Sequence, residues 1–202
     1  MLDGTYTGLK ESIASWMHRT DLTDLIPDFV ALAEERIANE LRLRLQISEA
    51  TLTTVAGTQD VTLPTDWLEI ENLSLNTPVK QLTYVNIEHL DSKYPSDFTG
   101  EPAVYTIEGN EIYFGPCPDA VYSVGLWYYA RFPALATAGT NTLLTKYPSI
   151  YLYGALAEAA NWAQDDILMT KCEIKYKAAV KQAQTQDDEA VHSGSALRVR
   201  RI

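Results

Sequence analysis

Cysteine, histidine and long hydrophobic runs are scarce in this sequence. Its 202 residues include only two cysteines and three histidines, each far from the others along the chain, so the close ligand spacing of a structural zinc site is missing and no metal site is predicted. Two isolated cysteines do not make a disulfide framework, which favours a reducing environment. The longest nearly apolar run, residues 150–157, is much shorter than the roughly 20 residues that span a bilayer. Since the chain also opens without a basic, apolar leader, we expect a soluble protein made in the cytoplasm, with no membrane contact.

Motifs for common enzyme chemistry are also missing. The sequence has no GxGxxG or Walker loop to hold phosphates and no GxSxG turn to present a serine nucleophile, so we predict no cofactor. The best carboxylate pair is Glu69 and Glu71, which share one face if their segment is a strand. Such a pair would suit an enzyme that cleaves polysaccharides, but a solvated strand face is the simpler explanation. We therefore predict no catalytic residues.

Charge is unevenly distributed along the chain. The net charge is −11, yet residues 192–202 contain Arg198, Arg200 and Arg201 and no acidic residue, so the remainder carries 13 basic and 27 acidic side chains, a net charge of −14. An acidic body repels phosphates and does not bind nucleic acid through phosphate neutralisation. The short basic end has either its own partner or the character of a solvated tail.

Helical patterns occupy both ends of the chain. Near the start, apolar residues recur at helical spacing, with a break at 19–21 and a second helix that opens near Pro27, a favourable first-turn residue. The helical pattern returns at Pro148. Within the helix that follows, Gly154 stands among alanines and predicts a close helix–helix approach. A last helix is predicted over residues 166–190.

The middle of the chain has the two-residue period of strands. A shift in the alternating pattern predicts a bulge near residues 71–73, and Gly109-Asn110 has the composition of a two-residue hairpin loop. The strand over 121–132 is apolar on both faces, as in a central or subunit-covered strand. A short helix is predicted at 86–94. Further strands are predicted at 48–55, 60–64, 66–75 and 78–84.

These patterns predict an α+β fold in which two N-terminal and two C-terminal helices form a bundle and an antiparallel β module is inserted between them. Neither helical pair buries its apolar stripe alone, so the pairs are expected to pack together. The predicted boundaries are 1–45 and 142–191 for the bundle, 46–133 for the β module with its short helix, 134–141 for a linker, and 192–202 for an extended basic C-terminal segment.

Aromatic residues are abundant, with twelve tyrosines and four tryptophans. Three consecutive aromatic residues in one strand cannot all face a single core, and two tyrosines of the following helix fall off its main apolar stripe. Exposed aromatic side chains are enriched in protein interfaces. We therefore predict a subunit interface at Trp127, Tyr128, Tyr129, Tyr151 and Tyr153.

Three stretches carry a family resemblance. They are LKESIASWMHRTDLTDLIPDFVALAEERIANELRLR (9–44), TLTTVAGTQDVTLPTDWLEIENL (51–73) and WYYARFPALATAGTNTLLTKYPSIYLYGALAEAA (127–160). In this order and spacing they resemble the head-to-tail adaptor, or connector, proteins of tailed bacteriophages, particularly those of short-tailed phages. None of the stretches is a catalytic motif, so the likeness rests on their order.

The resemblance implies a structural protein of the virion rather than an enzyme. Such adaptors form a ring of copies, usually twelve, below the portal of the capsid, where they extend the DNA channel and provide the platform for the tail nozzle. DNA then passes during genome ejection without specific binding, and the protein, made in the host cytoplasm, ends at the head–tail junction. The alternatives are another tail completion or tail-tube ring protein, a cell-wall or polysaccharide-acting enzyme, and a carbohydrate-binding module.

In these adaptors the C-terminal segment reaches up to grip the portal. By position alone, the resemblance assigns this role to residues 196–202 of the present chain. Leu197, Val199 and Ile202 are then expected to act as apolar plugs. Arg198, Arg200 and Arg201 are expected to pair with carboxylates of the portal, for which the planar guanidinium is well suited.

Overall fold

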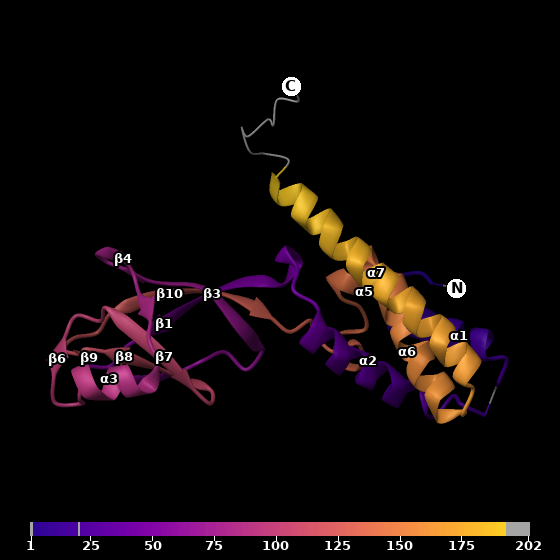
Figure 1. Cartoon of the computed structure of the whole chain (residues 1–202), viewed down its shortest axis with the longest axis horizontal. Helices are drawn as coiled ribbons and strands as arrows, with labels where there is room; N and C mark the ends of the chain where they lie inside the picture. The colour runs from indigo at the N-terminus through magenta and orange to yellow at the C-terminus, as the bar shows by residue number, and fades with distance from the viewer. Residues whose placement is uncertain (1, 20, 193–202) are drawn as a thin grey trace, which may run out of the picture. The chain divides into compact units, whose positions relative to one another are not determined.

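A computed structural model describes residues 2–19 and 21–192, with the side chains of 191 and 192 excepted. The fold is α+β, as the sequence predicts (Figure 1). The chain separates into two compact units, one formed by Met1–Leu45 with Phe132–Ile202 and the other by Gln46–Arg131. No helix among the described residues has the length and hydropathy needed to cross a membrane.

The first unit is helical. The predicted opening helices are confirmed: Thr5 caps the first by accepting a hydrogen bond from the Gly8 N–H (3.0 Å), and Pro27 lies in the first turn of the second. The segment 134–141, predicted as a linker, itself contains a four-residue helix with Leu135 fully buried. The described helices are α1 (Tyr6–Met17), α2 (Ile26–Glu40), α4 (Leu135–Ala138), α5 (Thr142–Lys146), α6 (Pro148–Trp162) and α7 (Asp166–His192).

Helix α6 lies at the centre of the helical unit, where it packs against α1, α2 and α7. The predicted close approach at Gly154 is confirmed, because a Cβ atom there would lie 3.2 Å from the Ala33 Cβ of α2 and 3.4 Å from a ring carbon of Tyr176 of α7. A larger residue at this position would therefore push two neighbouring helices away. The small side chains of α6 let three helices meet in one core.

The second unit is a β module that contains one α-helix, α3 (Ile87–Lys93). Asn86 caps this helix by accepting a hydrogen bond from the His89 N–H (3.0 Å). Its main sheet has the strand order β1-β10-β3-β4, a second sheet has the order β2-β8-β7-β5, and β6 pairs with β9. All pairings are antiparallel except β5–β7 and β6–β9. The strands are β1 (Ile47–Thr53), β2 (Asp60–Thr62), β3 (Trp67–Asn76), β4 (Val79–Gln81), β5 (Thr83–Tyr84), β6 (Thr99–Gly100), β7 (Val104–Glu108), β8 (Glu111–Gly115), β9 (Cys117–Pro118) and β10 (Ser123–Ala130), and a single 3₁₀ turn, η1 (Arg44–Gln46), precedes β1.

Two predicted local features of the β module are confirmed. Strand β3 pairs Ile70 with Tyr128 and Asn72 with Trp127, so Glu71 is the extra residue of a β-bulge. In the hairpin of β7 and β8, Glu108 pairs with Glu111 across Gly109-Asn110, and Gly109 has a φ of 64°. A positive φ at the first loop position but not at the second, Asn110, is typical of a type II′ turn. The bulge keeps the apolar residues on both sides of it directed toward the core.

Candidate interaction surfaces

The residues predicted to grip the portal lie outside the described part of the chain. These are Leu197, Arg198, Val199, Arg200, Arg201 and Ile202. The structure instead describes the helix that precedes them, α7, as far as His192. The contacts of α7 with the rest of the helical unit therefore fix the part of the chain that leads to these residues.

One end of α7 is held by an ion pair with Arg44. The backbone N–H and the Nε–H of Arg44 donate hydrogen bonds to the two carboxylate oxygens of Asp187, at 2.9 and 3.2 Å. Asp187 belongs to the acidic run Asp187-Asp188-Glu189 near the end of α7. Its carboxylate is mostly buried beside Arg44. The last turns of α7 are thus tied to the residue that closes the N-terminal helical segment.

The middle of α7 is held to α2 by a stronger pair. Two guanidinium N–H groups of Arg36 donate hydrogen bonds to the two carboxylate oxygens of Glu173. The donor–acceptor distance of the second hydrogen bond is 2.8 Å. This bidentate contact lowers the pKa of Glu173. The same guanidinium lies 4.2 Å from the ring centre of Tyr176. The charge of Lys177, four residues further along α7, also lowers the pKa of Glu173.

Strand β10 presents aromatic residues on one face of the main sheet. Trp127 is 43% exposed and Tyr129 is half-buried on the same face. Glu49 of β1 and Asn72 of β3 flank Trp127, while Ile47 and Glu69 flank Tyr129. Tyr128 points the other way, into the core, and its hydroxyl donates to Asp66 (3.1 Å). Burial and this carboxylate raise the pKa of Tyr128.

The two tyrosines of α6 also differ. Tyr151 is buried, and its hydroxyl accepts a hydrogen bond from the Asn141 side chain (2.8 Å). Tyr153 is half-buried and makes an edge-to-face contact with Trp16, with ring centres 5.9 Å apart. The ammonium of Lys175 lies over both rings.

The five aromatic residues of the predicted interface differ in exposure. Tyr128 is buried in the hydrophobic core of the β module. Tyr151 is buried in the hydrophobic core of the helical unit. Trp127, Tyr129 and Tyr153 retain exposed surface. Sequence reasoning missed other large apolar side chains that are about half exposed or more. Those on α2 and α7 fall outside the buried stripe of each helix, so helical periodicity was the signal that could have found them. They include Trp16, Leu32, Trp162, Ile167 and Ile174.

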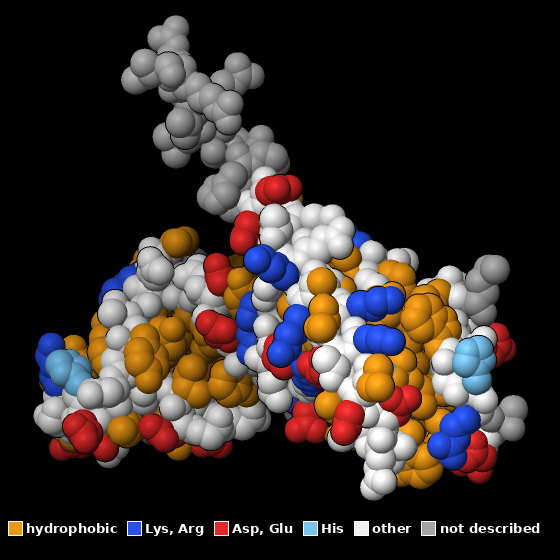
Figure 2. All heavy atoms as spheres, turned by 45° about the vertical axis from the view of Figure 1, so that its right-hand side comes forward, with side chains coloured by type: hydrophobic (Ala, Val, Ile, Leu, Met, Phe, Trp, Pro, Cys, Tyr) orange, Lys and Arg blue, Asp and Glu red, His pale blue; other side chains and the backbone are white. Residues whose placement is uncertain are grey.

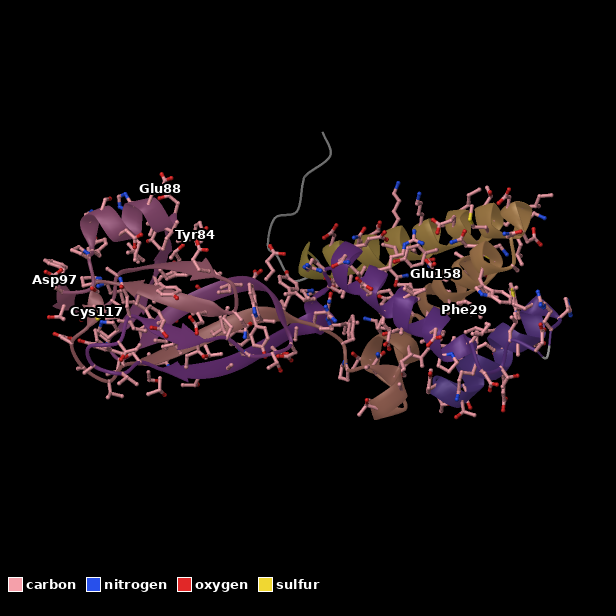
Figure 3. The ribbon with its side chains drawn as sticks, turned by 90° about the horizontal axis from the view of Figure 1, so that it is seen from below. Phe29, Tyr84, Glu88, Asp97, Cys117 and Glu158 are labelled. Atoms are coloured by element: carbon pink, nitrogen blue, oxygen red, sulfur yellow. The ribbon has the colours of Figure 1, made fainter. Side chains whose placement is uncertain are left out.

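The two cysteines and the carboxylate pair of Glu69 and Glu71 are the candidate reactive groups of the sequence. Cys117 and Cys172 are free and buried, and burial raises the pKa of both thiols (Cys117 is labelled in Figure 3). Within the described ranges, no cluster of three or more His, Cys, Asp or Glu residues could hold a metal ion. Glu69 and Glu71 are exposed on β3. An open hollow of about 480 Å³ beside α5 has Lys146 as its one ionisable lining residue; the others are Leu45, Thr140, Asn141, Thr142 and Thr145.

Comparison with known proteins places this geometry in a family. The model of a family described as SU10 adaptor protein matches residues 4–200, which covers both units and most of the basic C-terminal segment. No curated protein matches the chain. The resemblance to phage head-to-tail adaptors, drawn above from three stretches of sequence, is confirmed by a match that spans nearly the whole chain. The chain belongs to the SU10 adaptor protein family and is a structural adaptor of a bacteriophage virion.

Proposed function

We propose that this adaptor assembles into a closed ring, twelve-fold in the virion, that docks below the portal. The ring extends the DNA channel and provides the platform on which the tail nozzle assembles. The observation that carries this proposal is the adaptor-family match over residues 4–200. A ring also requires two different contact surfaces on each copy, and both units have exposed apolar side chains that can supply them (Figure 2).

The C-terminal segment is the proposed grip on the portal. Leu197, Val199 and Ile202 insert into apolar sites, and the three nearby arginines pair with carboxylates. The support is positional and electrostatic: the segment follows α7, which Arg36 and Arg44 fix to the rest of the helical unit. A segment that combines basic and apolar residues is suited to a partner with an acidic surface.

The aromatic face of the β module is a second proposed contact. Trp127 and Tyr129 combine large apolar rings with partial exposure, as interface residues do. We assign them, with Tyr153 of the helical unit, to a neighbouring subunit or to the nozzle. The bundle of the four main helices is proposed to form the body of the ring, with the β module as an insertion into it. DNA passes through the channel without specific binding, because acidic walls repel phosphates.

Deletion of residues 193–202 tests the portal contact. The shortened chain should keep the circular dichroism spectrum of the full chain, because the described helices and strands remain, and it should no longer co-sediment with purified portal. Two triple variants refine the test. R198K/R200K/R201K keeps the charge and should weaken binding less than R198E/R200E/R201E, which reverses it. Undiminished portal binding by the deleted chain would show that the grip lies elsewhere.

A further inference from the structure

Two outer faces of the helical unit carry opposite charge. The acidic α2 face consists of Asp28, Leu32 and Glu35, and the basic α7 face consists of Lys171, Ile174 and Lys181 with Ile167 at its start. All of these side chains are exposed. Figure 2 shows basic and hydrophobic side chains interspersed over the helical unit. Each face therefore combines an apolar centre with flanking charges of one sign.

Helical spacing explains the acidic α2 face. Asp28, Leu32 and Glu35 follow at intervals of four and three residues, so they form one stripe about 10 Å long. This stripe lies away from Ala33 and Ile37, which are buried against the other helices. Leu32 is 48% exposed between the two carboxylates.

The basic α7 face arises in the same way. Its buried side is formed by Cys172 and Tyr176. Ile167 and Ile174, one heptad apart, lie on the opposite side and are 70% and 64% exposed. Lys171 lies between the two isoleucines along the helix and Lys181 follows them, so the lysines flank Ile174 at an axial separation of about 15 Å.

In the described part of the subunit, none of the four charged side chains of these faces is in an ion pair, although the charge of Asp28, after burial and Glu34, helps to raise the pKa of Tyr6. Across residues 2–19 and 21–190, neither Asp28 nor Glu35 nor the two lysines enters a side-chain hydrogen bond or ion pair. By contrast, Arg36 and Glu173, which lie on the sides of α2 and α7 that face each other, are paired. The internal charges of the unit are thus matched, and the outward charges of opposite sign are left for another molecule.

We infer that the acidic α2 face of one copy docks on the basic α7 face of the next copy. The inference rests on the proposed ring and names the contact that closes it. Two different, complementary faces on one chain make a head-to-tail interface, which is the kind that generates rings. Leu32 then packs against Ile174, and each carboxylate meets a lysine. Since exposed ion pairs add little energy, the charges mainly select the orientation and exclude like-faced contacts.

The occupant of the basic α7 face is therefore a second copy rather than nucleic acid. The chain as a whole has a net charge of −11, which opposes approach of a polyphosphate. The apolar centre of the face, with its two isoleucines, also fits a leucine-bearing helix better than a phosphate backbone. An acidic surface of the portal is the remaining competitor, and the experiment separates it from a second copy.

Charge exchange between the two faces tests the contact. The variants are D28K/E35K, K171E/K181E and the combination of all four changes, which restores the net charge. D91K/D97K, on exposed acids of the β module with no partner among the described residues, is the matched control (Asp97 is labelled in Figure 3). Rings formed by the full chain on purified portal are counted by negative-stain electron microscopy and native mass spectrometry. Circular dichroism verifies that each variant is folded.

Each half of the exchange should reduce the yield of closed rings by at least about tenfold, because like charges then face each other. The combined variant should recover most of the rings, and D91K/D97K should behave as the unchanged chain does. Normal rings from either half, or no recovery by the folded combination, would overturn the pairing; loss with K171E/K181E alone would assign the α7 face to portal. If the unchanged chain forms no ring on portal, the proposed function fails, and the inference fails with it.

Discussion

At the scale of single residues, Asn141 organises the start of the C-terminal helices. Its side-chain oxygen accepts the N–H of Leu144 (2.8 Å) and so caps α5, while its amide donates to the Pro133 carbonyl (3.0 Å) and to the Tyr151 hydroxyl (2.8 Å). The residue is only 7% exposed. One buried side chain therefore serves three partners, of which Leu144 and Tyr151 are buried and Pro133 is exposed, and its loss would leave the two buried groups without these hydrogen bonds.

N141A should lower the free energy of unfolding by about 2–4 kcal/mol, since it removes a helix cap and strands buried polar groups. Urea unfolding followed by circular dichroism measures the loss. N86A is the matched control, because Asn86 is also an asparagine cap, on α3, but is exposed; its loss should be about 1 kcal/mol. Equal losses for the two variants would show that the buried network of Asn141 adds nothing to capping.

At the scale of elements, the pair of Arg36 and Glu173 makes the packing of α2 on α7 sensitive to pH. The hydrogen bonds from Arg36 lower the pKa of Glu173 in the folded state below its ordinary value of 4.5. The folded state therefore holds the proton less readily than the unfolded state does. The pair stabilises the fold fully above the unfolded pKa, and this contribution is lost as the pH falls through the folded pKa.

E173Q should consequently cost more stability at pH 7 than at pH values below the folded pKa, where the carboxylate of the unchanged chain is also neutral. Urea unfolding of both proteins over this pH range gives the difference. In the background R36M the effect of E173Q at pH 7 should shrink, because the partner is already gone. A difference that stays constant with pH would mean that the ion pair does not contribute to stability.

The elements also show which features local pattern could predict. The bulge at Glu71, the loop at Gly109 and the close approach at Gly154 each follow from a few neighbouring residues, and all are confirmed. Burial of Tyr128 and Tyr151 depends instead on the other elements that cover them, which a local pattern does not show. The short helix α4 was missed because four residues are too few to show a helical period. The charged faces of α2 and α7 lie opposite the buried stripes of these helices, so helical periodicity was the signal that could have located them.

At the scale of the whole molecule, the two units have separate hydrophobic cores. Every residue of one core comes from 2–45 or 132–183, and every residue of the other comes from 50–130. The β module also begins and ends on paired strands, since Ile47 of β1 lies opposite Tyr129 of β10. A chain that enters and leaves a module at adjacent points can be cut there without removing strand pairs.

Residues 46–131 expressed alone should therefore fold, with a single cooperative urea transition and a free energy of unfolding of about 5 kcal/mol. The reason is that the strand pairs and the core of the module lie within these residues. The complementary chain, with 46–131 replaced by a short Gly/Ser linker, should keep its helical circular dichroism, because Gly154 still packs between α2 and α7. A β fragment without a cooperative transition would mean that the helical unit is needed to hold it. Successful folding of both pieces would let the portal contact and the aromatic face of β10 be assayed separately, so that each is assigned to its own partner in the virion.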